Sequence, residues 1–272
     1  MYRAYWNMEY NPFAKEIDIN KLYKTKDFNE ARTRLEFLEK TKGIGLFTGN
    51  PGCGKTYAIK NYLDNLNSSL YKIVYLHLTT VGVNDFYRSL CLGLGLETFY
   101  SKTKMFVQIQ EHIRKLVIEQ KKHLFIAIDE CQLLKPEILT DLKILFNFEM
   151  DSKNLATVLL IGLPVINYTL SKTVFEDLNQ RILMKYDFKG IGESEIREYI
   201  SDRLRLVKAS EDIFTEDAIK SMANIVNGSI RRLNLIIERA LIIGALDKVA
   251  RSKFWDNNEG TKWYKFNVIG EI

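Results

Sequence analysis

Short apolar runs alternate with longer amphipathic stretches along the chain up to about residue 190. Runs of this kind predict buried strands, and they occupy residues 43–47, 72–78, 123–130, 156–163 and 183–188. The amphipathic stretches between them predict helices. The alternation therefore indicates an α/β fold, with a parallel sheet whose strands are joined by helical crossovers.

Several of the expected helices have recognisable starts. Asn84 is expected to cap a helix over residues 84–96, and residues 103–120 carry apolar side chains at helical spacing. Pro136 is expected to open a further helix, because proline fits the first turn. These helices would cover the faces of the sheet.

Only helices are predicted beyond residue 190. The stretches 192–207 and 229–246 have helical periodicity, and Thr215 is placed to cap a helix between them. This part of the chain is expected to form a small all-α lid domain. We therefore expect an N-terminal arm over 1–26, a nucleotide-binding α/β domain over 27–189, the helical lid over 190–250 and a C-terminal tail over 251–272.

A glycine-rich loop follows the first predicted strand and precedes a helix. The segment from Gly49 to Thr56 matches G-x-x-x-x-G-K-[ST] in every fixed position. Such a loop turns several backbone N–H groups and a helix N-terminus toward one phosphate, Lys55 reaches the outer phosphates, and the Thr56 hydroxyl binds magnesium. A glycine-rich turn without a ligand is the alternative. The residues expected to bind the nucleotide are Gly49, Asn50, Pro51, Gly52, Cys53, Gly54, Lys55, Thr56 and Tyr57.

Two acidic residues, Asp129 and Glu130, end the apolar run over 123–130. In a nucleotide-hydrolysing site the first would hold magnesium and the second would polarise the attacking water. The alternative is a helix N-cap, in which an acidic side chain meets backbone N–H groups. A pair of acids after a fully apolar strand favours the catalytic interpretation.

Composition excludes some classes of protein. The 272 residues are 46% hydrophobic and 27% charged, which is enough for a large core. We expect a cytoplasmic protein without a membrane partner, because no apolar run is long enough to span a bilayer and the first residues do not resemble a secretory signal. Three cysteines and three scattered histidines suggest no metal or redox pair. A net charge of +5 is compatible with a nucleic-acid partner.

The ordered motifs of the chain resemble the AAA+ ATPases, and more closely the ExeA-like branch that includes the transposition ATPases of the TnsC, MuB and TniB kind. Besides the two nucleotide motifs, the resemblance rests on NPF (11–13), DEC (129–131), LIGLP (160–164), NQRI (179–182) and GSIRRLN (228–234). It implies a three-layer αβα P-loop domain with a helical lid, and ATP with Mg²⁺ as substrate and cofactor.

The resemblance also assigns roles to arginines. It implies that Arg181 acts as a finger in a neighbouring subunit's site and that Arg231 senses ATP from the lid, with Arg232 as a weaker candidate. A solvated helix face is the alternative for any one of them. The chain departs from the family at Leu163, where relatives often carry a polar residue that touches the γ-phosphate. Asn167 or Thr157 would replace that residue only in part.

The resemblance implies an ATP-dependent regulator of DNA transposition. Such a protein assembles on duplex DNA as a ring or helical filament and recruits a transposase and a target-selection protein. An ExeA-type secretion ATPase, or a signalling or defence NTPase that does not bind DNA, is the alternative. In TnsC-like proteins the DNA-facing loops precede the second nucleotide motif, which here points to Lys102, Thr103 and Lys104. Two solvated lysines at a helix start are the competing interpretation.

The two ends of the chain are less informative. A helix over 27–40 is expected to start with an Asp27···Glu30 capping box. The family implies that the arm before it lies beside the adenine, so Phe13 or Tyr23 would pack on the base, although core packing is the commoner fate of an aromatic residue. In the tail, DNNEG reads as a turn between two strands, which would bind a partner or cover the lid.

Overall fold

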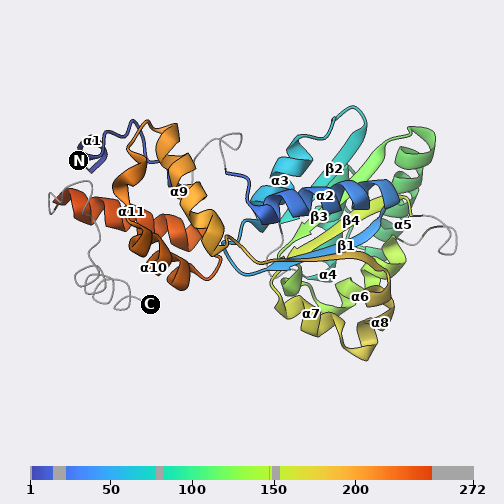
Figure 1. Cartoon of the computed structure of the whole chain (residues 1–272). Coiled ribbons are helices and arrows are strands. Elements are labelled where there is room, and N and C mark those ends of the chain that lie inside the picture. Colours follow the sequence, from blue (N-terminus) through green and yellow to red (C-terminus); the bar gives the residue numbers. More distant parts are fainter. Residues whose placement is uncertain (1, 15–22, 78–81, 147, 149–153, 247–272) are drawn as a thin grey trace. The chain divides into compact units, whose positions relative to one another are not determined.

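The computed structural model describes residues 2–14, 23–77, 82–146, 148 and 154–246, and the predicted tail lies outside these residues. The chain forms two compact units (Figure 1). One is the sheet unit, Phe28–Phe188. The other is the helical unit, which combines Met1–Asp27 with Lys189–Ile272.

Five parallel strands form the sheet of the first unit. They are β1 (Gly43–Gly49), β2 (Tyr71–His77), β3 (His123–Asp129), β4 (Ala156–Gly162) and β5 (Ile182–Phe188). Their order is β2-β3-β4-β1-β5. Because all the strands run the same way, their carboxyl ends share one edge of the sheet, and β4 lies between β1 and β3. The predicted parallel sheet is confirmed.

Helices cover both faces of this sheet. They are α2 (Lys26–Thr41), α3 (Lys55–Asp64), α4 (Val83–Leu94), α5 (Lys102–Arg114), α6 (Pro136–Leu145), α7 (Val165–Leu170) and α8 (Glu176–Gln180), with the short turns η2 (Lys115–Glu119), η3 (Cys131–Leu133) and η4 (Thr173–Phe175). Strand β3 illustrates the arrangement. Ile126 packs in a core cluster with residues of α4, α5 and α6, whereas Phe125 packs with residues of α2 and α3. Both faces are apolar, which explains the continuous apolar runs in the sequence.

Two of the predicted helix starts are wrong. Asn84 does not cap α4, because the helix begins at Val83 and the extended Gly82 occupies the cap position without a side-chain hydrogen bond. Asp27 does not lie at the cap position of α2 either. Helix α2 begins at Lys26, and the Asp27 carboxylate accepts a hydrogen bond from the Gly190 N–H at 2.7 Å.

Other helix predictions are confirmed with small changes. Pro136 occupies the first turn of α6. The helix expected over 103–120 is capped by the Ser101 hydroxyl and changes from α-helix to the π-helical turn η2 after Arg114. In the helical unit the Thr215 hydroxyl accepts a hydrogen bond from the Ala218 N–H at 3.3 Å.

The helical unit contains both early and late segments of the chain. Its elements are α1 (Tyr2–Tyr5), α9 (Glu193–Leu206), η5 (Glu211–Ile213), α10 (Glu216–Val226) and α11 (Ile230–Leu246). Trp6 is buried and donates from its indole nitrogen to the Leu241 carbonyl at 2.8 Å. Asn11 donates to the Glu238 carboxylate at 2.7 Å. The early segment is therefore part of the core of this unit.

Phe13 and Tyr23 both contact Tyr199 of α9. Phe13 is buried in the core of the helical unit, with its ring 6.4 Å from that of Tyr199. Tyr23 meets the same ring edge-on and donates a hydrogen bond from its hydroxyl to Glu198 at 2.9 Å. The structure thus gives Phe13 the core packing that the sequence left as the alternative to base stacking.

Two glycines let the chain pass itself closely in this unit. Gly190 and Gly228 have φ values of 82° and 79°, and a Cβ on Gly190 would lie 2.0 Å from the Gly228 carbonyl oxygen. The Ile191 N–H donates to that same oxygen at 2.9 Å. Any other residue would push the two backbones apart, which explains the glycine of GSIRRLN.

No helix within the described residues combines the length and the apolar character that crossing a bilayer requires. The three cysteines, Cys53, Cys91 and Cys131, are all buried.

Candidate nucleotide site

The glycine-rich loop joins β1 directly to α3. Gly52 and Gly54 have φ values of 79° and 97°, and Gly54 immediately precedes the helix. At Gly49 a Cβ would lie 2.8 Å from the Phe188 Cβ and 2.9 Å from the Cys53 Sγ. These glycines therefore meet backbone requirements that other residues would not meet. The predicted arrangement of strand, loop and helix is present.

Lys55 lies inside this loop. Its side chain is buried, and its ammonium donates to the carbonyl oxygens of Gly49 at 2.7 Å and Asn50 at 3.0 Å. The first residue of α3 thus places a positive charge beside the positive end of the helix dipole, which is an arrangement suited to an anion. Of the other loop residues, Asn50 and Pro51 are exposed and Cys53 is buried. Tyr57 stacks on Phe28, with ring centroids 5.6 Å apart.

Asp129 lies beside Thr56 at the carboxyl edge of the sheet. The Thr56 hydroxyl, from the first turn of α3, donates to the carboxylate of Asp129, the last residue of β3, at 3.4 Å. A hydroxyl and a buried carboxylate form the hard oxygen set that Mg²⁺ prefers, with waters and substrate phosphates completing its coordination. The described residues contain no cluster of three or more His, Cys, Asp or Glu side chains that would hold a metal by themselves. The residues fit a magnesium ion that is held mainly by substrate.

Tyr75 is a member of the site that the sequence did not indicate. From β2, it donates a hydrogen bond to the same Asp129 oxygen at 2.6 Å, and the His77 Nδ1 lies 3.7 Å from that oxygen. Burial, and the hydrogen bond to Asp129, raise the pKa of the Tyr75 phenol above its ordinary value. The phenol therefore remains a donor at neutral pH. The strand register Leu76↔Ile128 brings it there, and sequence spacing alone does not give that register.

Glu130 follows Asp129 in a left-handed conformation, with φ 57°. Its N–H donates to the Asp129 carboxylate at 2.9 Å, and its own carboxylate accepts from the Gln132 amide at 2.6 Å. Burial raises the pKa of the neighbouring Cys131 thiol to about 12, so this cysteine is an uncharged core residue. Asp129 and Glu130 are thus both held at the end of β3, facing the edge that carries the phosphate loop.

Leu163 follows the last residue of β4, between the ends of β1 and β3. Thr157 does not lie at this edge, because it is the second residue of β4 and pairs with Gly43 at the amino end of β1. The suggestion that Thr157 partly replaces the missing polar side chain is therefore wrong. Asn167 lies in α7, and its carbonyl oxygen accepts from the Ser171 N–H at 3.0 Å.

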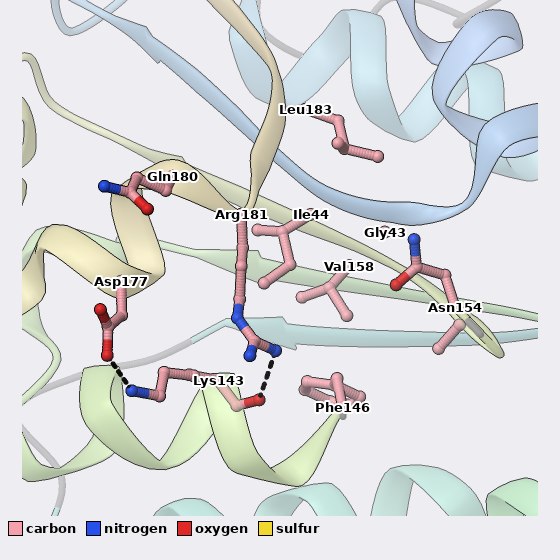
Figure 2. A pocket seen from close by; sticks show the side chains of 11 residues that line it. Gly43, Ile44, Lys143, Phe146, Asn154, Val158, Asp177, Gln180, Arg181 and Leu183 are labelled. Carbon is pink, nitrogen blue, oxygen red and sulfur yellow. Dashed lines mark hydrogen bonds and ion pairs between the residues drawn. The ribbon is translucent and has the colours of Figure 1, made fainter. Parts of the chain in front are cut away.

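Arg181 lies at the opposite edge of the sheet. It is the C-cap of α8, and its guanidinium donates to the Lys143 carbonyl oxygen at 3.4 Å (Figure 2). In the register of β1 with β5, Ile44 pairs with Ile182 and Gly49 with Phe188. Arg181 precedes the first of these pairs, and the phosphate loop begins at the second. The two pairs are five residues apart along β1, which corresponds to about 17 Å. Arg181 therefore cannot complete the phosphate site of its own chain.

The guanidinium of Arg181 faces a pocket of 580 Å³ at this amino edge. Lys143 also lines it and forms an ion pair with Asp177, which lowers the pKa of the Asp177 carboxyl below its ordinary value (Figure 2). The remaining lining residues are Gly43, Ile44, Phe146, Asn154, Ala156, Val158, Gln180 and Leu183.

Arg231 and Arg232 lie in the first turn of α11, in the helical unit, and both are exposed. The Arg232 N–H donates to the Ser229 hydroxyl at 3.3 Å, so Ser229 caps this helix. The approach of Arg231 to a nucleotide stays a prediction.

Lys102, Thr103 and Lys104 form the first turn of α5. Thr103 and Lys104 are exposed, whereas the Lys102 ammonium lies 2.6 Å from the Asp141 carboxylate and 5.6 Å from the centre of the Tyr87 ring. Lys102 thus already has an anionic partner within its own unit.

Replacing Tyr75 by Phe is expected to weaken Mg²⁺-dependent nucleotide binding. The substitution removes one hydrogen bond to Asp129 and leaves the ring in place. Removing such an outer partner of a metal ligand typically costs about 10- to 100-fold in metal affinity. Titration of an ATP analogue at several Mg²⁺ concentrations measures the effect. Tyr71→Phe on the same strand is the matched control, because the Tyr71 hydroxyl pairs with Glu39, away from the site. Equal Mg²⁺ dependence in both variants would contradict the role of Tyr75.

Comparisons with known proteins bear on the family and the fold of this chain. Residues 38–170 match the family model described as "AAA domain". The chain is 29% identical over 247 residues to General secretion pathway protein A of Aeromonas hydrophila, and it covers 44% of that protein's length, so it spans less than half of this relative.

Solved structures with a similar fold include Cdc6p from Pyrobaculum aerophilum, with a TM-score of 0.63, 16% identity and coverage of 87% of this chain and 66% of that one. They also include the Aeropyrum pernix ORC1 protein in complex with DNA, with a TM-score of 0.63, 14% identity and coverage of 94% and 68%. The fold is thus an AAA+ P-loop fold, and the chain is similar to the AAA domain over residues 38–170 and to General secretion pathway protein A.

Proposed function

We propose that this protein is a Mg²⁺-dependent ATPase whose turnover depends on assembly. The observation that carries the proposal is the meeting of Lys55, Thr56, Asp129 and Glu130 at one edge of the sheet, with the Thr56 hydroxyl 3.4 Å from the Asp129 carboxylate. Lys55 and the loop N–H groups bind the phosphates, and the family resemblance adds Arg231 as a residue that contacts the nucleotide. Thr56 and Asp129 would hold Mg²⁺, which would supply charge neutralisation at the phosphates.

The chain's own groups divide the remaining work. Glu130 accepts a proton from the attacking water, because it is the carboxylate at this edge that does not already accept the Thr56 and Tyr75 hydroxyls. The backbone N–H groups of the loop orient the terminal phosphate for in-line attack. That the bound nucleotide carries adenine is proposed from the family resemblance alone.

The position of Arg181 supports action between subunits. It lies about 17 Å along the strands from its own phosphate loop, so it can act on a phosphate only in another copy of the chain. A ring or helical filament could satisfy this requirement if each amino edge met the neighbour's carboxyl edge. We therefore infer a homo-oligomer in which each site is completed by the next subunit's Arg181.

The task that this ATPase drives is proposed to be regulation of DNA transposition in the cytoplasm, with duplex DNA, a transposase and a target-selection protein as partners. The motif set of the sequence and the net charge of +5 support this proposal. One of the proteins of similar fold was solved in complex with DNA. The second candidate is a secretion-type assembly ATPase, and the similarity to General secretion pathway protein A favours it.

Duplex DNA separates the two candidates. If the chain assembles on DNA, saturating duplex should raise ATP turnover and shift the protein to larger species in sedimentation with an ATP analogue. The effect should fall steeply with salt, because phosphate contacts release counterions. A secretion-type ATPase would hydrolyse ATP without either response, and that result would overturn the transposition proposal.

The same assay tests the DNA contacts. Lys104→Ala should weaken duplex binding and flatten its salt dependence while leaving ATP affinity unchanged. Lys102→Ala is expected to have a smaller effect on DNA, because its ammonium is paired with Asp141. Lys220→Ala on α10 is a control at another exposed lysine.

A further inference from the structure

We propose that Gln132 is the residue that positions Glu130 for water activation, and that it does so by tying Glu130 to the end of β4. The inference rests on the proposed ATPase function and adds a residue to its machinery. Gln132 lies in η3, two residues after Glu130. Its amide makes two hydrogen bonds, one with Glu130 just after β3 and one with Leu163 just after β4.

The two bonds fix the orientation of the Gln132 amide. Its Nε2 donates to the Glu130 Oε2 at 2.6 Å, and its Oε1 accepts from the Leu163 N–H at 3.0 Å. A carboxylate only accepts hydrogen bonds and a backbone N–H only donates, so the reversed amide would lose both bonds. The Leu163 N–H therefore donates to Gln132, and Gln132 donates to Glu130, in one fixed order.

The backbone near Gln132 leaves room for these two hydrogen bonds. A Cβ on Gly162 would lie 2.6 Å from the Gln132 Oε1 and 2.7 Å from the Cys131 Sγ, so a larger residue there would displace the bridge. The left-handed Glu130, with φ 57°, begins the tight turn that folds Gln132 back toward β4. The absence of a side chain at Gly162 and the turn at Glu130 therefore both help to place the Gln132 amide.

The bridge has a consequence for the chemistry. Because Gln132 donates to the Oε2 atom of Glu130, the other carboxylate oxygen is the better placed of the two to accept a proton from water. The carboxylate is also held against rotation. Leu163 follows the last residue of β4 and brings no polar side chain to this edge. Here its backbone N–H, acting through Gln132, links the end of β4 to Glu130.

Gln132→Glu tests the positioning role. The new side chain keeps an oxygen for the Leu163 N–H but replaces the donor to Glu130 by a second carboxyl oxygen. We expect kcat at pH 8 to fall about 10- to 100-fold, as for other groups that orient a reacting residue, with the affinity for an ATP analogue and the melting temperature nearly unchanged. As the pH falls, the introduced carboxyl takes up a proton and regains a donor. The variant's kcat should therefore rise relative to wild type at low pH.

A purely structural role would not give that pH response. Gln132→Met, which removes both bonds at similar length, should lower kcat at all pH values and thus serves if Gln132→Glu does not fold. Gln110→Glu is the matched control, because the Gln110 amide donates to the Ile144 and Leu145 carbonyls away from the site. It should change stability and leave kcat unchanged.

The outcomes separate the two proposals. A wild-type chain that does not hydrolyse ATP with or without duplex DNA would overturn the proposed function and this inference with it. An active wild type, with Gln132→Glu and Gln132→Met both within twofold of its kcat and parallel pH profiles, would overturn the role of Gln132 alone.

Discussion

Glu130→Gln protein should bind Mg²⁺ and ATP as the wild type does but hydrolyse ATP more slowly by about 10²- to 10⁴-fold, the usual contribution of a general base. The amide has the shape of the carboxylate but cannot take the proton of the attacking water. Its oxygen can still accept the hydrogen bond from Gln132. Phosphate release measures turnover, and titration with a fluorescent ATP analogue measures binding.

Two further variants make this result specific. Glu137→Gln makes the same chemical change at an exposed position in the first turn of α6 and should leave turnover unchanged. Lys55→Ala should lose nucleotide binding itself, because it removes the buried ammonium of the phosphate loop. Wild-type turnover in Glu130→Gln protein would show that another group activates the water.

Arg181→Ala should reduce turnover by roughly 10³-fold or more, the usual effect of removing an arginine finger. Binding of the nucleotide to the isolated chain should be unchanged, because Arg181 lies at the opposite edge of the sheet from its own phosphate loop. Arg32→Ala, at an exposed position on α2 where the guanidinium pairs with Glu36, is the control for loss of an arginine.

Mixing the two inactive variants tests action between subunits. In an equal mixture of Arg181→Ala and Glu130→Gln chains, about a quarter of the sites combine an intact Glu130 with a neighbour's Arg181, so up to that share of the wild-type rate should return. Co-assembly is checked by sedimentation of differently labelled chains. If the two variants assemble together and the mixture stays inactive, Arg181 does not act in a neighbouring site.

The parts of this site that are contiguous in the chain could be predicted from the sequence. The loop from Gly49 to Thr56 and the pair Asp129–Glu130 each carry their chemistry within a few residues, and the apolar runs before them fix strands that end at one edge. The continuous apolar runs likewise predict a sheet that is covered on both faces. Fold class and nucleotide chemistry follow from such local signals.

Contacts that depend on strand register were not predictable. Tyr75 reaches Asp129 because β2 pairs in register with β3, and Gln132 reaches Leu163 because β4 lies beside β3. The local rules also fail where a distant group competes. Asp27 has the right spacing for a capping box, but the Gly190 N–H, which is remote in sequence, takes its carboxylate. A single sequence contains no signal for that partner.

The division of the helical unit between the two ends of the chain has a consequence for biosynthesis. Trp6 and Leu241, which are joined by a hydrogen bond, are 235 residues apart, so at 5–20 residues per second the ribosome needs roughly 10 to 50 s to make the second partner after the first. The sheet unit is complete before then. Its folding brings Asp27 near Gly190, which shortens the effective loop that the Trp6 contact must close. Until α11 emerges, Trp6 lacks the Leu241 carbonyl that accepts its hydrogen bond, and this early segment is where we expect a nascent-chain chaperone to bind.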